Sequence, residues 1–160
     1  MENQKKLALI ATKGTLDWAY PPFILASTAA ALGYEAQIFF TFYGLNLLKK
    51  KLNLKVSPLG NPGMPMPMGM DKWFPTLGTA LPGMEGVMSG MMKQKMKSKG
   101  VASVEELRDL CIEADVKLIA CQMTVDLFDF KKEDLIDGIE SGGAATFFEF
   151  AGEADISLFV

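Results

Sequence analysis

Two cysteines, Cys111 and Cys121, are the side chains of this sequence best suited to covalent chemistry. The chain contains no histidine, so it lacks the usual base of a catalytic triad and the commonest metal ligand of proteins. A thiolate needs neither of these, because it is itself a nucleophile. Thiol chemistry is therefore the first candidate for a function of this chain.

Cys121 directly follows the apolar run VKLIA at 116–120, which predicts a buried strand, and Gln122, Met123 and Thr124 begin the helix predicted after it. The free N–H groups and the positive end of a helix dipole favour a thiolate, and such settings lower a cysteine pKa from about 8.5 to between roughly 3.5 and 7.5. We therefore expect Cys121 to be nucleophilic at neutral pH. The alternative is a buried cysteine that only packs against the sheet.

Cys111 lies on the apolar face of a helix that begins at the capping box Ser103-Val-Glu-Glu106, and it is close to the C-terminal end of that helix. The helix dipole disfavours a thiolate there, so packing is its expected role. A disulfide with Cys121 is not expected. Cys111 should lie near the start of the strand at 116–120, and Cys121 lies about 16 Å further along that strand. A helix and a sheet are separated by a further distance of roughly 10 Å. Together these distances exceed the Cα separation of about 7 Å that a disulfide spans.

Strands and helices alternate along the rest of the chain. Strands are predicted at 5–12, 34–41, 116–120, near 136–140 and at 156–160, and helices at 22–32, 43–51, 84–97, 103–114, from 124, within 131–140 and at 144–154. This pattern predicts an α/β, flavodoxin-like three-layer sandwich with a five-stranded parallel sheet in the order 2-1-3-4-5. The turn Lys13-Gly14-Thr15 after the first strand would then line the same sheet edge as Cys121, as an anion-binding turn without a nucleotide-binding motif.

A segment rich in methionine, proline and glycine at about 57–86 interrupts this pattern, and we interpret it as an insertion within a single domain over 1–160. Met64, Met66, Met68 and Met70 alternate with prolines and glycines. They favour an apolar lid or partner-docking surface, with a Cu(I) site as the alternative. The amphipathic, methionine-faced helix at 84–97 is expected to be buried in an oligomer, the alternative being peripheral contact with a membrane surface.

The overall composition narrows the class of partner. A net charge of −3 and the lack of a basic stripe with aromatic residues argue against nucleic acid. A hydrophobic content of 49% and a mean hydropathy of +0.19 predict a homo-oligomer. The apolar stretches are too short for a signal peptide or a membrane span, so we expect a cytoplasmic protein with reduced thiols, without a metal or cofactor.

The stretch VKLIACQMTVDLFDFKKEDLIDGIESGGAATFFEFA at 116–151 resembles the C-terminal half of DsrE/DsrF-like sulfurtransferases, in the larger branch often labelled peroxiredoxin-like. The N-terminal KLALIATKGTLDWAYPPFILASTAAALGYEAQIFFTFYGL is similar to the same branch. The resemblance implies a homo-oligomeric sulfur-trafficking protein that carries a persulfide on Cys121 between donor and acceptor proteins, with Cys111 as a relay thiol. The alternatives are a non-catalytic flavodoxin-like binding or scaffold module, and a thiol-redox protein that uses both cysteines.

Overall fold

The computed structural model describes residues 4–57 and 81–160. Contacts divide the chain into two compact units, the first made of Met1–Gly14, Trp18–Leu52 and Val104–Val160 and the second of Thr15–Asp17 and Asn53–Ser103. The first unit contains the sheet and both cysteines. The single domain over 1–160 stays a prediction.

The first unit is built on a five-stranded sheet in which every pair of neighbours is parallel. Its strands are β1 (Lys6–Ala11), β2 (Glu35–Phe40), β3 (Lys117–Cys121), β4 (Glu140–Gly142) and β5 (Ile156–Phe159). The predicted α/β class with a five-stranded parallel sheet is therefore confirmed.

The strand order is β4-β3-β2-β1-β5 and differs from the predicted 2-1-3-4-5. β2 occupies the centre, between β1 and β3. Five of its six residues are buried, with Ile38 and Phe40 fully enclosed. A central position covers both edges of such an apolar strand, whereas the predicted order would have left it at the edge of the sheet.

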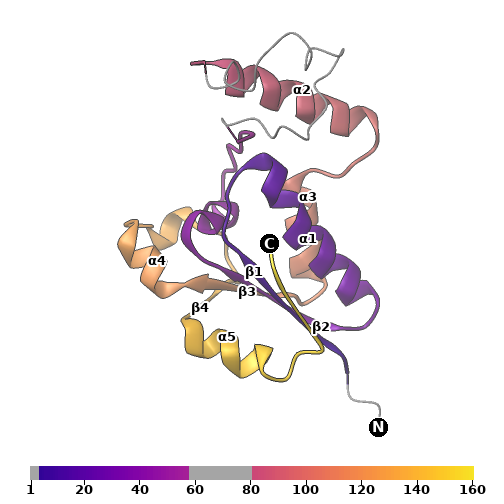
Figure 1. The fold of residues 1–160 in the computed structure, drawn as a ribbon, viewed down its shortest axis with the longest axis vertical. Coiled ribbons are helices and arrows are strands. Elements are labelled where there is room, and N and C mark those ends of the chain that lie inside the picture. Colours follow the sequence, from indigo (N-terminus) through magenta and orange to yellow (C-terminus); the bar gives the residue numbers. More distant parts are fainter. Residues whose placement is uncertain (1–3, 58–80) are drawn as a thin grey trace. The chain divides into compact units, whose positions relative to one another are not determined.

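Helices cover the two faces of the sheet and give the predicted three layers (Figure 1). On one face, Phe23 of α1 (Leu16–Ala31) packs against Phe40, with ring centroids 5.8 Å apart, and α3 (Val104–Glu113) lies beside α1. On the other face, Phe147 of α5 (Ala144–Ala151) packs against Phe39 at 5.6 Å. Phe39 and Phe40 are consecutive, and their opposite directions follow from the alternation of side chains along a strand.

Helix α1 begins at Leu16, six residues before its predicted start at Pro22. Pro21 and Pro22 therefore lie inside the helix, where they cannot donate to the preceding turn. Leu16 and Ala19, which precede the prolines, are buried. Burial of this first turn offsets the lost hydrogen bonds.

The shorter elements differ more from prediction. The predicted helix at 43–51 is a 3₁₀ helix, η1 (Phe42–Leu48), and the helix predicted within 131–140 is the short 3₁₀ helix η4 (Lys132–Asp134). The strand predicted near 136–140 lies later in the chain, since β4 (Glu140–Gly142) shares only Glu140 with the predicted range. In contrast, α4 (Gln122–Leu127) begins directly after β3, at the residues where the sequence predicts it.

The second unit contains α2 (Met84–Ser98), the predicted methionine-rich helix. Its Ser89 hydroxyl accepts a hydrogen bond from the Val56 N–H at 2.9 Å, and Lys55 pairs with Glu85 at 2.6 Å. Ser89 is the one buried residue of α2, whereas Met91 is exposed. Most of the predicted insertion, with Met64, Met66, Met68 and Met70, lies outside the described residues.

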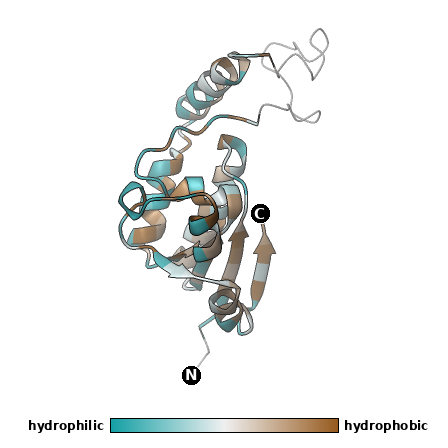
Figure 2. Ribbon diagram, turned by 90° about the vertical axis from the view of Figure 1, so that its left-hand side faces the viewer, coloured by the Kyte–Doolittle hydropathy of each residue, from teal (hydrophilic) through white to brown (hydrophobic). Residues whose placement is uncertain are grey.

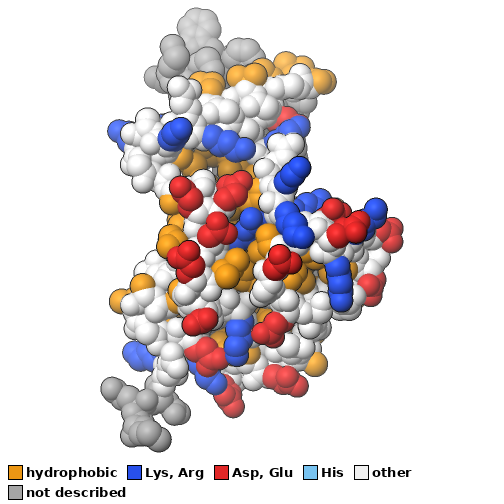
Figure 3. All heavy atoms as spheres, turned by 180° about the vertical axis from the view of Figure 1, so that it is seen from behind, with side chains coloured by type: hydrophobic (Ala, Val, Ile, Leu, Met, Phe, Trp, Pro, Cys, Tyr) orange, Lys and Arg blue, Asp and Glu red, His pale blue; other side chains and the backbone are white. Residues whose placement is uncertain are grey.

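Figures 2 and 3 show where hydrophobic and charged residues lie in the fold. Most strands of the sheet are largely hydrophobic, and this includes the strand that ends at the C-terminus (Figure 2), whereas β4 is made of Glu140, Ser141 and Gly142. Acidic and basic side chains are interspersed on the face that Figure 3 shows, without a continuous basic stripe.

Candidate functional site

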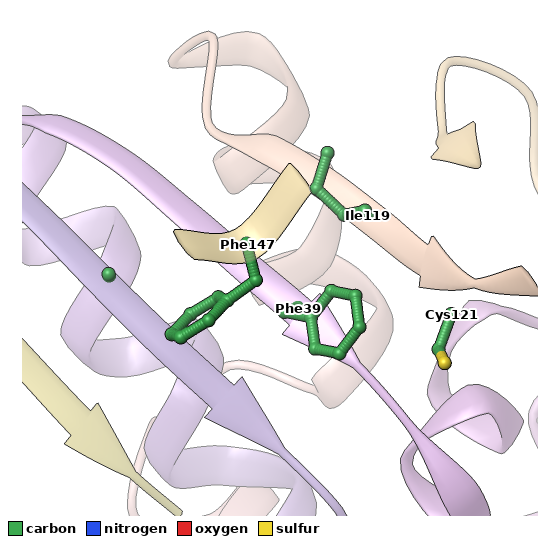
Figure 4. Packing of buried hydrophobic residues seen from close by; sticks show 5 residues of the cluster. Phe39, Ile119, Cys121 and Phe147 are labelled. Atoms are coloured by element: carbon green, nitrogen blue, oxygen red, sulfur yellow. The ribbon is translucent and has the colours of Figure 1, made fainter. Parts of the chain in front are cut away.

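Cys121 occupies the junction of β3 and α4, at the N-cap position of the helix. Its side chain joins a cluster on the α5 face of the sheet that includes Phe39, Ile119 and Phe147 (Figure 4). Only 5% of the residue is exposed. A reaction partner can therefore contact only a small part of this residue.

Polar groups from two segments face this sulfur. Burial, the largest single influence, raises the pKa of the Cys121 thiol, but hydrogen bonding from Thr124 (hydroxyl and N–H), the Thr41 hydroxyl and the Met123 N–H together lowers the pKa below the ordinary thiol value. These N–H groups do not form a regular N-cap hydrogen bond with the side chain. Their dipoles still favour negative charge on the sulfur. The site thus stabilises a thiolate despite its burial.

The two threonine hydroxyls also contact each other. Thr41 Oγ1 lies 3.1 Å from Thr124 Oγ1, and the Phe42 N–H donates to Thr124 Oγ1 at 3.2 Å. Phe42 has a φ of +47°, in the left-handed region that is uncommon for a bulky residue. Because the Thr124 oxygen accepts from Phe42, its own hydrogen is available to the sulfur or to Thr41.

Cys111 lies on the opposite face of the sheet from Cys121. Its thiol donates to the Phe23 carbonyl of α1 at 3.4 Å, and none of its surface is exposed. Burial raises the pKa of Cys111 to about 12, although the Ser27 N–H lowers it slightly. Both cysteines are free. The thiol of Cys111 therefore stays protonated at neutral pH.

The other predicted site residues divide into two groups. Of those after Cys121, Thr124 is fully buried and faces the sulfur, the Met123 side chain is exposed, and Gln122 donates to Asp126 at 2.8 Å. The Lys13–Thr15 turn follows β1, which β2 separates from β3. Lys13 Nζ lies 3.2 Å from the centroid of the Trp18 ring.

Thr15 belongs to the second compact unit. Its hydroxyl is buried and makes no hydrogen bond within the described part of the chain.

Sequence reasoning missed Thr41 and Phe42, which follow β2. A threonine directly after a strongly apolar strand was a usable signal, but the two threonines are 83 residues apart in sequence. The predicted strand order also placed β1 beside β3. Only the observed order brings the end of β2 next to Cys121.

The segment that carries Thr41 and Phe42 is fixed at its start by close backbone packing. A Cβ atom on Gly44 would lie 2.2 Å from the Ala11 carbonyl oxygen, and one on Gly14 would lie 2.3 Å from the Tyr43 carbonyl oxygen. No other residue type fits these two positions without movement. Gly14 thus has a packing role.

Arg108 fixes the other end of this segment. Its Nη1 donates to the carbonyls of Leu47 and Lys49 at 2.9 and 2.8 Å, and the residue is buried. Burial lowers the pKa of the guanidinium, while Asp109 and Glu105 raise it. These two hydrogen bonds from the charged guanidinium hold the C-terminal end of η1 against α3.

An exposed aromatic surface, made of Phe42, Tyr43 and Phe128, flanks the junction. Phe128 stacks on Tyr43 at 5.6 Å and meets Phe42 edge-on at 6.3 Å. Phe42 follows Thr41, and Phe128 directly follows α4, the helix that Cys121 caps. Exposed aromatic clusters of this kind are typical of protein-binding surfaces.

Within residues 4–57 and 81–160, no group of three or more histidine, cysteine or acidic side chains is placed to hold a metal ion. No helix in these same ranges has both the length and the apolar character needed to cross a membrane.

Comparisons with known proteins identify the family of the chain. A family model described as DsrE/DsrF/DrsH-like matches residues 3–159. The chain is 80% identical over 158 residues to the "Sulfur carrier protein DsrE2" of Allochromatium vinosum, covering 99% of both chains. It is 33% identical over 162 residues to the "Uncharacterized protein YrkE" of Bacillus subtilis, again over 99% of both.

Among solved structures, the ychN protein from E. coli is similar in fold. The TM-score is 0.57 at 11% sequence identity, over 98% of this chain and 100% of the other. This likeness concerns the fold alone. The family match over nearly the whole chain, together with the two relatives, shows that the chain belongs to the DsrE/DsrF/DrsH-like family.

Proposed function

We propose that this protein is a sulfur carrier that holds a persulfide on Cys121 and passes the sulfane sulfur between partner proteins. The observation that carries the proposal is the position of the buried Cys121 at the N-cap of α4, where Thr124 and Thr41 lie and where the surroundings lower the pKa of its thiol. The name of the relative in Allochromatium vinosum supports the same role.

The transfer step needs only a thiolate and a donor persulfide. The Cys121 thiolate attacks the outer sulfur of the donor, a new S–S bond forms at Cys121, the donor S–S bond breaks, and the donor leaves as a thiolate. The acceptor thiolate repeats this step on the Cys121 persulfide and restores the Cys121 thiolate. No oxidant or reductant is consumed, because one sulfur atom moves between two thiols.

Burial of Cys121 suits a carrier, since a persulfide is labile where other thiols reach it freely. The donor must bring its own sulfur to a residue with 5% exposure, so contact between the two proteins is required. The surface of Phe42, Tyr43 and Phe128 is the part of the chain we assign to this contact.

Cys111 takes no part in the carrier step that we propose. Its pKa of about 12, its full burial and its position on the opposite face of the sheet all weigh against a relay role. The same features weigh against a redox pair of Cys111 and Cys121. A cytoplasmic setting belongs to the proposal, because a thiolate carrier works only where thiols are kept reduced.

Sulfur loading tests the proposal directly. The protein is incubated with a low-molecular-weight persulfide, freed of excess donor and weighed intact by mass spectrometry. We expect the mass of one added sulfur atom in the wild type and in Cys111→Ser, and none in Cys121→Ser. Equal loading of Cys121→Ser would contradict the proposal, and an inert wild type would favour a non-catalytic binding module.

A further inference from the structure

The backbone of Phe42 has a conformation that its side chain disfavours. Its φ of +47° lies in the left-handed region, and the other residues with a positive φ, apart from glycines, in the described part of the chain are Asp115 and Asp129. Aspartate visits this region more readily, because its short polar side chain can bond locally, whereas a bulky residue there is a genuine outlier. Such strain persists only where the surroundings impose it, and it is concentrated at functional sites.

Backbone contacts on both sides of Phe42 impose this conformation. The Thr41 N–H donates to the Ala11 carbonyl at 3.1 Å, and the Gly44 N–H donates to the Thr41 carbonyl at 3.0 Å. Gly44 also packs directly against the Ala11 carbonyl, where a Cβ would not fit. Residues 41 and 44 are thus fixed beside the end of β1, and Phe42 takes the left-handed turn between them. Because the ring of Phe42 is 45% exposed, its burial compensates little of the strain.

The strained conformation directs the Phe42 N–H at the Thr124 hydroxyl oxygen, 3.2 Å away. The angle φ is the rotation about the N–Cα bond, so a different φ would turn the peptide group that carries this N–H relative to η1. A hydroxyl has one hydrogen and two lone pairs. Phe42 occupies a lone pair of Thr124, which is fully buried, so the hydroxyl hydrogen points to another neighbour. Those neighbours are Thr41 Oγ1, at 3.1 Å, and the sulfur of Cys121.

We infer that Phe42 is a positioning residue for the thiol, because its left-handed backbone holds the N–H on Thr124 and so directs the Thr124 hydroxyl hydrogen to the sulfur of Cys121. A hydrogen bond to the charged form of a group favours that form. The backbone of Phe42 thus supports the thiolate, in addition to the contact that its ring makes in the aromatic surface. The inference rests on the proposed function only in taking the thiolate as the reacting form.

Two substitutions that both remove the ring separate the role of the backbone from that of the side chain. Glycine adopts a positive φ freely, whereas the β-branched valine strongly disfavours it. In a Cys111→Ser background, the alkylation of Cys121 by iodoacetamide is followed as a function of pH. The pH of half-maximal rate should be higher in Phe42→Val than in Phe42→Gly. At neutral pH, Phe42→Gly should react roughly tenfold faster than Phe42→Val, the factor expected for one hydrogen bond to a charged group.

Asp115→Val is the matched control, because it places the same side chain at a φ of +57° before β3, at the opposite end of that strand from Cys121. It should lower the denaturant midpoint and leave the alkylation profile of Cys121 as in the wild type. If Phe42→Val does not fold, Phe42→Ala replaces it and should show a smaller shift in the same direction, since alanine also disfavours a positive φ.

Equal profiles for the glycine variant and its valine or alanine counterpart at Phe42 would overturn the inference. A profile of Asp115→Val that moves as far as that of Phe42→Val would do the same, because the effect would then follow from lost stability alone. Alkylation involves no sulfur transfer, so these outcomes decide the role of Phe42 independently of the sulfur loading that tests the proposed function.

Discussion

At the scale of single residues, two free cysteines of one chain are in opposite electrostatic settings. Cys121 receives hydroxyl and N–H groups that favour its thiolate, whereas burial keeps Cys111 protonated. The sequence predicts this contrast from the ends of two helices. It does not predict Thr41, because the neighbours of a strand end depend on which strands are adjacent in the sheet.

The Thr124 hydroxyl is expected to decide the reactivity of Cys121. Thr124→Val removes the hydroxyl, so the pKa of Cys121 should rise, and the lost acceptor of the Phe42 N–H should destabilise the fold by about 1–3 kcal/mol. Thr124→Ser keeps the hydroxyl and serves as the control. The alkylation rate of Cys121 as a function of pH gives the pKa, and equal profiles for the two variants would contradict this role.

The raised pKa of Cys111 predicts a pH dependence of stability. Its folded pKa of about 12 exceeds that of an ordinary thiol, so the folded state holds a proton that the unfolded state loses as pH rises from about 9 to about 12. The contribution of this proton to the free energy of unfolding is fully present below about pH 9. Above that pH it should fall by at most about 1.4 kcal/mol per pH unit. Denaturant unfolding of the wild type and of Cys111→Ala at several pH values checks this. In the variant, the free energy of unfolding should fall less steeply with pH above about pH 9.

At the scale of elements, the thiol site depends on where the end of β2 lies. The sequence predicts β2 and β3 well, because both are short apolar runs with clear ends. It does not predict their adjacency, since the choice of central strand depends on how the whole sheet buries its most apolar member. For this reason the predicted lining included Lys13–Thr15 and omitted Thr41 and Phe42.

Gly44 is expected to fix η1 in position. The Cβ of Gly44→Ala would lie 2.2 Å from the Ala11 carbonyl oxygen, so the start of η1 must move. We expect the free energy of unfolding to fall by about 1–3 kcal/mol, as in an overpacked core. Gly90→Ala in α2 is the matched control, because nothing lies within 4 Å of the added atom. This control should stabilise its helix by roughly 0.5–1 kcal/mol. Denaturant midpoints compare the two, and a harmless Gly44→Ala would refute the packing role.

At the scale of the whole molecule, the first unit exposes many large apolar side chains, and two groups of them stand out. One is the aromatic surface beside Cys121, and the other is β5 at the edge of the sheet. The composition predicts exposed apolar surface, but it does not predict where that surface lies. In our account, the aromatic surface is the group that meets sulfur-transfer partners.

Removal of the aromatic surface should separate partner contact from thiol chemistry. Tyr43→Ser with Phe128→Ser should slow sulfur transfer from a protein donor, because both exposed rings are lost. Loading from a small persulfide should be unchanged, since the groups that lower the pKa of Cys121 are Thr124, Thr41 and Met123, and all three are kept. Intact mass over time measures both rates, and equal slowing with the two donors would argue against a docking role.

The central claim is that the Cys121 thiolate itself takes up the sulfur. The most direct measurement is the rate of sulfur uptake from a low-molecular-weight persulfide as a function of pH, followed by intact mass in Cys111→Ser, where Cys121 is the remaining cysteine. The account predicts a rate that reaches half its maximum below the pH at which an ordinary thiol ionises, as the lowered pKa requires. A rate that follows an ordinary or raised thiol pKa, or uptake that survives Cys121→Ser, would contradict it.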